Sequence, residues 1–305
     1  MSSPTPVPAT LRVAAGQFGS VLGDVTANVE STMEAMRTAR ARGIDLLVLP
    51  ECGLTGYVFH TREEVRKVAL DRDAPEIARV AALADDLDLI VVLGFLEAAG
   101  DDVFNTATLL QPGGRRADYR KTHLPSLGAD RFVTPGENEP VLVETSFGVV
   151  GLSICYDLRF PEWARCLALG GADIIVNPTN WPEPAQRVAE LYTRVRAAEN
   201  HVFVIAANRG DEERGVPFIG RSQIIDPVGT VLASSERGDA LVVADIDPLT
   251  ARNKDISVPE ADFAISLFGG RRPHLYDALT RVATDDDVPA APVPASTELH
   301  PNGKV

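Results

Sequence analysis

The chain has 305 residues, of which 45% are hydrophobic and 24% charged, proportions that are ordinary for a globular protein. A net charge of −14 argues against a nucleic-acid partner, because it leaves no basic surface to neutralise phosphates. The apolar runs are far shorter than the roughly 20 residues that cross a bilayer, and the N-terminus lacks a basic segment followed by a long apolar one, so we expect neither a membrane span nor a secretory signal.

Apolar patterns predict strands that alternate with helices along the chain. Strands are expected over residues 11–18, 44–49, 87–96, 104–111, 115–119, 141–145, 149–154, 172–177, 201–207, 220–226, 230–234 and 240–245. Helices are expected over 25–42, 73–86 and 161–169, and in a further segment that ends at residue 200. This alternation predicts an α/β layered fold with a mixed sheet. The ends of the chain, 1–10 and 283–305, have the composition of flexible tails.

Three cysteines, at 52, 155 and 166, cannot all pair within one chain. They fit a reducing compartment better than a disulfide framework, so a cytoplasmic location is expected. The five histidines show no metal-binding spacing, and we expect neither a metal nor an organic cofactor.

Three predicted strands each end in a residue that can do chemistry. Glu51 ends IDLLVLPE, Lys121 ends ADYRK, and Cys155 ends VVGLSIC. Each residue alone has a structural explanation, for example a buried cysteine or a surface lysine. In open α/β sheets, however, ligands bind at the carboxyl ends of the strands, so the three together indicate an active site.

These three groups suit nucleophilic attack on a carbonyl or nitrile carbon. A thiol needs a base or a positive neighbour to react at neutral pH. The carboxylate of Glu51 could take the proton of Cys155 and later return it to a leaving amine. The ammonium of Lys121 could stabilise the oxyanion of the tetrahedral adduct.

The same residues with their surroundings resemble the nitrilase superfamily of carbon–nitrogen hydrolases. The resemblance rests on LPECGLTGY around Glu51, YRKTHLP around Lys121 and GLSICYDLRFPE around Cys155, and it covers nearly all of residues 11–280. It implies a single domain over 11–280 with a four-layer αββα sandwich, a homodimer or higher oligomer, and a small amide, carbamoyl or nitrile substrate. The segment CYDLRFPE resembles the corresponding segment of the amidase and carbamoyl-amidase branches.

The sequence departs from the family pattern at a second acidic residue. Many members carry a second glutamate in the loop between the lysine and the cysteine, where this chain reads SLGADRFVTPGENEP. Asp130 is the nearest acid and the first candidate to replace it. Glu137, beyond the Pro135-Gly136 turn, is the second.

Residues near these strand ends are candidates for the substrate pocket. The backbone N–H of Tyr156 is placed for an oxyanion hole. Asn180 and Trp181 follow the next strand, and Tyr57 and Phe59 follow Glu51.

Three residues around the nucleophile have structural interpretations instead. We expect Asp157 and Arg159 to form an ion pair beneath the site. We expect Cys166, on the following helix, to be buried.

The expected function is hydrolysis of a small linear amide or an N-carbamoyl amine to a carboxylic acid and ammonia, through a thioester on Cys155. A nitrilase on the same site is the alternative within this class. A catalytically silent binding protein with the same fold is the alternative from another class, and acyl transfer on the same site is a third possibility.

Overall fold

The computed structural model describes residues 10–258 and 262–281. The chain divides into two compact units, Met1–Gly269 and Gly270–Val305. The described part of the second unit holds two short 3₁₀ turns, Pro273–Leu275 and Asp277–Leu279. The predicted tails, residues 1–10 and 283–305, lie outside the described residues except for Thr10.

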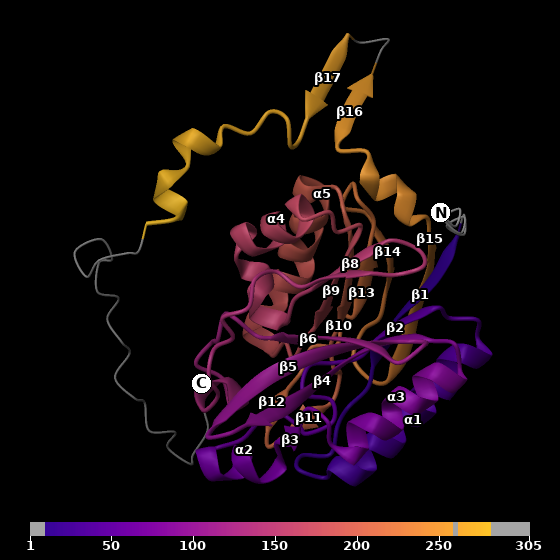
Figure 1. The fold of residues 1–305 in the computed structure, drawn as a ribbon, viewed down its shortest axis with the longest axis vertical. Helices are drawn as coiled ribbons and strands as arrows, with labels where there is room; N and C mark the ends of the chain where they lie inside the picture. The colour runs from indigo at the N-terminus through magenta and orange to yellow at the C-terminus, as the bar shows by residue number, and fades with distance from the viewer. Residues whose placement is uncertain (1–9, 259–261, 282–305) are drawn as a thin grey trace, which may run out of the picture. The chain divides into compact units, whose positions relative to one another are not determined.

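The first unit is built on two β-sheets (Figure 1). The first sheet has the order β15-β1-β2-β4-β5-β6, with β3 paired to β4, and the second has the order β14-β13-β10-β9-β8-β7. The strands of the first sheet are β1 (Leu11–Gln17), β2 (Leu46–Val48), β3 (Leu70–Asp71), β4 (Ile90–Ala99), β5 (Asp102–Gln111), β6 (Arg115–Arg120) and β15 (Ala240–Ile246). Those of the second are β7 (Leu142–Glu144), β8 (Val149–Leu152), β9 (Ile174–Pro178), β10 (Phe203–Ala207), β13 (Gln223–Ile225) and β14 (Val231–Ser234). Two small hairpins, β11 (Glu212–Glu213) with β12 (Val216–Pro217) and β16 (Asp255–Val258) with β17 (Phe263–Ser266), stand apart from these sheets.

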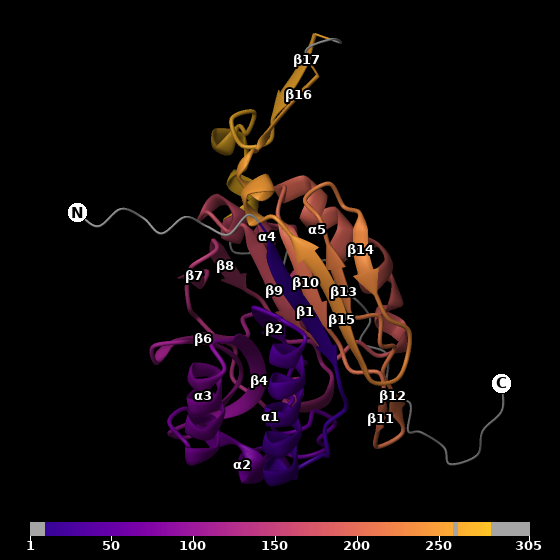
Figure 2. The same ribbon diagram turned by 90° about the vertical axis from the view of Figure 1, so that its right-hand side faces the viewer.

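Alternating side chains show how the layers stack. Along β1, Val13 and Ala15 belong to the core that the two sheets share, whereas Ala14 between them belongs to the core under the helices α1 (Val25–Ala41) and α3 (Pro75–Asp86). Side chains of α4 (Pro161–Leu169) and α5 (Thr193–Asn200) pack with the second sheet. The expected αββα sandwich is therefore confirmed, with one helical layer outside each sheet (Figure 2).

The predicted helix that ends at residue 200 departs from regular α-helical geometry. It is preceded by a 3₁₀ turn, Glu183–Ala185, in the segment where Pro182 and Pro184 lack the N–H that a helix interior needs. A π-helical turn, Val188–Tyr192, then leads into α5, and the hydroxyl of Thr193 donates to the carbonyl of Ala189 at 3.1 Å. The sequence interpretation also missed the short helix α2 (Arg62–Val68), which is capped by the side chain of Thr61.

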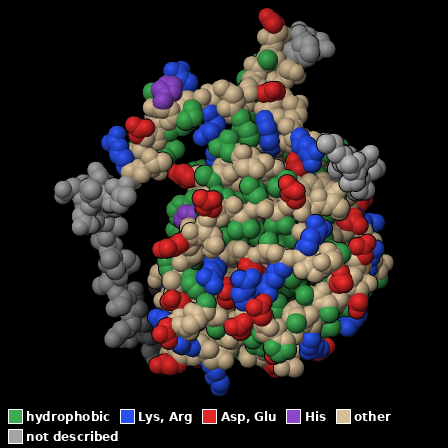
Figure 3. Space-filling view, viewed as in Figure 1, with side chains coloured by type: hydrophobic (Ala, Val, Ile, Leu, Met, Phe, Trp, Pro, Cys, Tyr) green, Lys and Arg blue, Asp and Glu red, His purple; other side chains and the backbone are tan. Residues whose placement is uncertain are grey.

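Over residues 10–258 and 262–281, no helix has both the length and the apolar character needed to cross a bilayer. On the face shown in Figure 3, acidic and basic side chains are interspersed.

Candidate active site

Glu51 is carried by a strand that is buried on both faces. β2 lies between β1 and β4 and runs parallel to both, so its three residues are fully enclosed. The chain leaves this strand through Leu49 and Pro50, and the side chain of Glu51 is itself only 2% exposed. A carboxylate is thus delivered into the protein interior at the carboxyl end of a parallel strand.

Lys121 follows β6 directly and contacts two carboxylates. Its ammonium donates to Oε1 of Glu51 at 2.7 Å and to Oδ2 of Asp130 at 2.6 Å. Asp130 reaches this point because a 3₁₀ turn, Gly128–Arg131, folds the loop after β6 back over the lysine. Glu137, the second candidate for this position, is exposed to solvent. The structure therefore places Asp130, and not Glu137, against the ammonium.

Asn105, on β5, joins the two acids. Its amide donates to Oε1 of Glu51 at 2.7 Å and to Oδ1 of Asp130 at 2.8 Å. Tyr57 adds a hydroxyl bond to Oδ2 of Asp130 at 2.7 Å. The sequence interpretation missed Asn105, although an amide inside the mostly apolar VFNTATLL strand was a visible signal. Asp130 is thus fixed from three sides.

Cys155 begins a 3₁₀ turn, Cys155–Arg159, after β8. Its φ of 44° lies in the left-handed region, which is uncommon for a residue with a side chain. Asp157 holds this turn: its Oδ2 accepts from the backbone N–H of Ile154 at 2.8 Å and from the hydroxyl of Tyr119 at 2.8 Å. The buried carboxylate of Asp157 therefore stabilises the turn in which the backbone of Cys155 is strained.

The predicted ion pair between Asp157 and Arg159 is wrong. Asp157 pairs with His123, whose Nδ1 lies 2.7 Å from Oδ1, so the carboxylate links the cysteine turn to the segment after Lys121. Arg159 points elsewhere, with its guanidinium near the rings of Tyr156 and Tyr192. The prediction for Cys166 is also wrong, because that thiol is exposed on α4.

Burial determines the electrostatics of the reactive groups. Burial raises the pKa of the Glu51 carboxyl, with the charge of Asp130 adding to the effect and Lys121 opposing it. Burial alone would lower the pKa of Lys121, but the two carboxylates hold that pKa well above its ordinary value. Burial, followed by the charge of Glu51, raises the pKa of the Cys155 thiol to about 12. The resting thiol is therefore protonated, and it needs a base to react.

Glu51 has a carboxylate oxygen free for this purpose. Its Oε1 accepts from Lys121 and Asn105, whereas its buried Oε2 has no hydrogen-bond partner among the described residues. A buried carboxylate oxygen without a hydrogen bond lowers the stability of the fold, so such an oxygen in a native protein suggests a functional role. Proton exchange with Cys155 would be such a role.

A cavity of about 220 Å³ opens over Cys155. Tyr156, Asn180 and Trp181, three of the predicted pocket residues, line it together with the cysteine. Asn180 also donates to the backbone carbonyl of Glu51 at 2.9 Å, which ties the pocket wall to the acid. The other lining residues are Pro125, Leu127, Arg159, Pro182, Pro184, Ala185 and Val188.

The two remaining predicted pocket residues lie in a different place. Tyr57 and Phe59 are buried in a cluster with Leu96 and Val103, behind Asp130. Tyr57 still contacts the site through its hydroxyl bond to Asp130.

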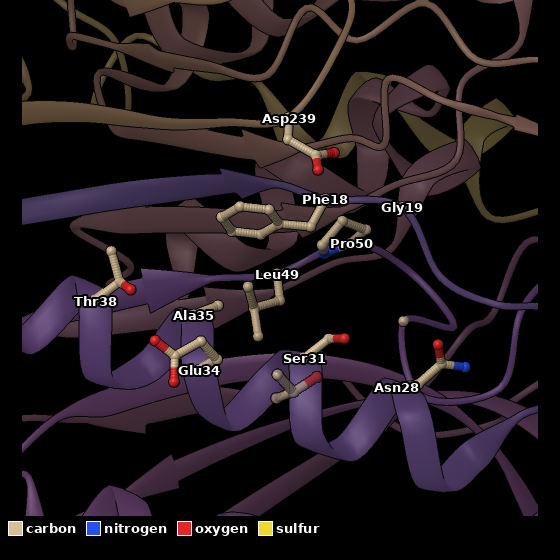
Figure 4. Close-up of a pocket in the computed structure, with 12 residues that line it drawn as sticks. Phe18, Gly19, Asn28, Ser31, Glu34, Ala35, Thr38, Leu49, Pro50 and Asp239 are labelled. Carbon is tan, nitrogen blue, oxygen red and sulfur yellow. The ribbon is translucent and has the colours of Figure 1, made fainter.

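A second hollow, of about 360 Å³, has Pro50 among its lining residues (Figure 4). It is bounded by Phe18 and Leu49 at strand ends, by the face of α1 that carries Ser31 and Glu34, and by Asp239. The candidate active site is the smaller cavity, because Cys155 lines that one.

With this geometry established, comparison with known proteins identifies the family. The profile of the family described as carbon-nitrogen hydrolase matches residues 12–254. The chain belongs to this family. It is accordingly a hydrolase that acts on carbon–nitrogen bonds, as the sequence resemblance implied.

Relatives of this carbon–nitrogen hydrolase carry several activities in their names. It is 38% identical over 251 residues to a nitrilase of Pyrococcus abyssi, covering 81% of this chain and 94% of the relative. It is 34% identical over 256 residues to an (R)-stereoselective amidase of a Pseudomonas species, covering 83% and 91%. It is 30% identical over 281 residues to the N-carbamoylputrescine amidase of Arabidopsis thaliana, covering 84% and 91%.

Solved structures of an amidase from Nesterenkonia sp. AN1, a nitrilase-superfamily enzyme, share the fold. A double mutant of it in complex with acrylamide is 25% identical, with a TM-score of 0.74 over 90% of this chain and 99% of that one. A second structure, also 25% identical with a TM-score of 0.72 over 88% and 99%, shows Michael addition of acrylamide at that enzyme's active-site cysteine. These likenesses support amide chemistry at an active-site cysteine in this family.

Proposed function

We propose that this carbon–nitrogen hydrolase is an amidase that converts a small linear amide or N-carbamoyl amine to a carboxylic acid and ammonia. The observation that carries the proposal is the buried contact of Lys121 with Glu51 and Asp130, beside a cavity lined by Cys155. With an N-carbamoyl amine, carbon dioxide and the free amine would be released with the ammonia.

In the first half-reaction, Sγ of Cys155 attacks the amide carbon while Oε2 of Glu51 takes the thiol proton. The raised pKa of Cys155 keeps the resting thiol protonated, and the raised pKa of Glu51 makes its carboxylate a stronger base. These two properties support transfer of the proton in the same step as the attack. The developing oxyanion would accept hydrogen bonds from Nζ of Lys121 and from the backbone N–H of Tyr156. Glu51 then returns the proton to the leaving nitrogen, ammonia departs, and a thioester remains.

In the second half-reaction, water replaces ammonia. Glu51 takes a proton from the water as the water attacks the thioester, and the same oxyanion donors act again. Collapse of the adduct releases the carboxylic acid, and Glu51 returns the proton to the thiolate of Cys155. In this scheme Asp130 touches no substrate: it keeps Lys121 charged and aimed at the oxyanion.

The proposed activity is tested with matched amide and nitrile pairs, such as butyramide and butyronitrile, scored by ammonia release. A higher kcat/KM for the amide supports the amidase, and a higher value for the nitrile overturns it in favour of a nitrilase. Hydroxylamine added to the amide reaction should trap the thioester as a hydroxamate. Hydroxamate formation that greatly exceeds hydrolysis would instead indicate an acyl transferase. An unreactive Cys155 in thiol titration would indicate a silent binding protein.

We also propose that the enzyme assembles as a homodimer through its outer helical layer. Leu169 on α4, Leu191 on the π-helical turn and Val195 on α5 are 41%, 47% and 46% exposed, and side chains of this kind on adjacent helices favour a partner surface. Light scattering after size exclusion should give twice the monomer mass, and Val195→Glu should reduce it. A cytoplasmic location is part of the same proposal, because the nucleophile must remain a free thiol.

A further inference from the structure

Arg159 is the only charged side chain among the described residues that line the cavity over Cys155. The walls are otherwise mostly apolar, with Leu127, Trp181 and Val188 among them. Such walls suit a chain of methylene groups. The cavity thus combines a reactive thiol, an apolar channel and one cation.

This cation has no carboxylate partner in the described part of the chain. Its guanidinium carbon lies 5.9 Å from the ring centroid of Tyr156 and 5.6 Å from that of Tyr192, so its near neighbours are aromatic faces. The buried side chain of Arg196 donates to the backbone carbonyl of Arg159 at 3.1 Å, which fixes the backbone position of Arg159.

Two acidic residues that lie close in sequence to the lining residues are paired with other arginines. Glu183, between the lining residues Pro182 and Pro184, pairs with Arg237 at 2.7 Å. Glu190, on the π-helical turn, pairs with Arg221 at 3.3 Å. The chain has 43 acidic and 29 basic residues, so a basic residue without an acidic partner at the mouth of a cavity calls for a ligand.

We infer that the cavity selects amides whose acyl chain ends in a carboxylate, that is, monoamides of linear dicarboxylic acids. Arg159 would bind the terminal carboxylate through charge-assisted hydrogen bonds while the apolar walls cover the methylenes and the amide carbon meets Cys155. Substrates with a terminal ammonium would face a cation of the same sign. This inference rests on the proposed amidase function and narrows its substrate class.

The test uses three amides with the same three-methylene spacer: glutaramate, which ends in a carboxylate, pentanamide, which is neutral, and γ-aminobutyramide, which ends in an ammonium. Wild-type kcat/KM should fall in that order. Arg159→Gln should reduce the ratio of kcat/KM for glutaramate to that for pentanamide by about ten- to a hundredfold, mainly through KM, as expected for loss of a hydrogen bond to a charged group. Arg159→Glu should favour γ-aminobutyramide over glutaramate.

A matched control distinguishes a direct contact between Arg159 and the substrate from the general electrostatic effect of a nearby positive charge. Arg187 is also exposed and lies next to the lining residue Val188, but it does not line the cavity. Arg187→Gln should leave the glutaramate to pentanamide ratio within about twofold of wild type. The wild-type preference should also weaken as salt screens the exposed guanidinium.

The inference is overturned if the three amides react alike and Arg159→Gln leaves the ratio unchanged, a result that would leave the amidase function standing. If no amide reacts, the proposed function fails, and binding then tests Arg159 independently. In that case glutaramate should bind to Cys155→Ala, as measured by calorimetry, at least tenfold more tightly than to Cys155→Ala with Arg159→Gln. Equal binding to the two variants would reject the role of Arg159.

Discussion

Nζ of Lys121 lies 2.6 Å from Oδ2 of Asp130, and both side chains are fully enclosed by the protein. A buried ammonium needs a compensating charge to remain protonated, and here it has two, because Glu51 is bonded to the same nitrogen. In the proposed mechanism, one of these acids also exchanges a proton with the thiol. With two acids present, Asp130 can keep Lys121 charged and in place while Glu51 exchanges the proton of the thiol.

The role of Cys155 is tested by its removal. Cys155→Ala should abolish turnover of every amide, because no other thiol lines the cavity among the described residues. The fold should survive, since the change removes one small side chain. Cys166→Ala is the matched control and should keep full activity, because Cys166 is exposed on α4. Ammonia release by a well-folded Cys155→Ala would show that the nucleophile is misassigned.

The role of Glu51 is tested through rate and thiol pKa together. Glu51→Gln should lower kcat by about two to four orders of magnitude, the range for a general acid–base residue. It should also lower the pKa of Cys155 below its wild-type value of about 12, because the charge of Glu51 is one of the causes that raise it. Thiolate absorbance against pH, with Cys155→Ala as the blank, measures this change. An unchanged thiol pKa would mean that Glu51 does not act on Cys155.

Lys121→Met should lower kcat by about two to three orders of magnitude, as for loss of one oxyanion donor. It should also make stability depend on pH, because Glu51 and Asp130 would lose their shared cation. A carboxyl group with a pKa above the ordinary 4.5 in the folded state binds its proton more tightly there than in the unfolded state. Its contribution to the free energy of unfolding is complete below pH 4.5 and is lost as the pH rises through the folded-state pKa. Thermal unfolding should therefore show the variant weakening relative to wild type from about pH 4.5 upward. A rate within tenfold of wild type would contradict the oxyanion role.

Asp130→Asn keeps the size of the side chain but removes its charge. It should lower kcat more than it raises KM, by less than the two to three orders of magnitude expected for losing the donor itself, because Lys121 stays in place but is less well held. Glu137→Gln, on the same loop but exposed, is the control and should have no effect. Single-turnover rates of thioester formation measure the affected step. The reverse pattern, with Glu137→Gln slow and Asp130→Asn normal, would reject the role of Asp130.

The sequence by itself determined the α/β layering and the strand ends at which Glu51, Lys121 and Cys155 lie, and the motifs around these residues carried the resemblance that implied the family and its sandwich fold. It could do so because these features are local: strand and helix periodicity, turn residues and the motifs around each reactive group all fall within short segments. The extent of the domain, predicted as residues 11–280, stays a prediction.

Tertiary structure decided which side chains meet across long separations. Asp130 prevails over Glu137 only because a 3₁₀ turn folds its loop over Lys121. Asp157 pairs with His123 and not with Arg159, because two segments 34 residues apart converge at the cysteine turn. Arg159 is thereby left among the residues that line the cavity, and the proposed role of its charge in substrate selection depends on this position. A pattern along the chain cannot foresee such pairings, because they depend on how loops pack against one another in space.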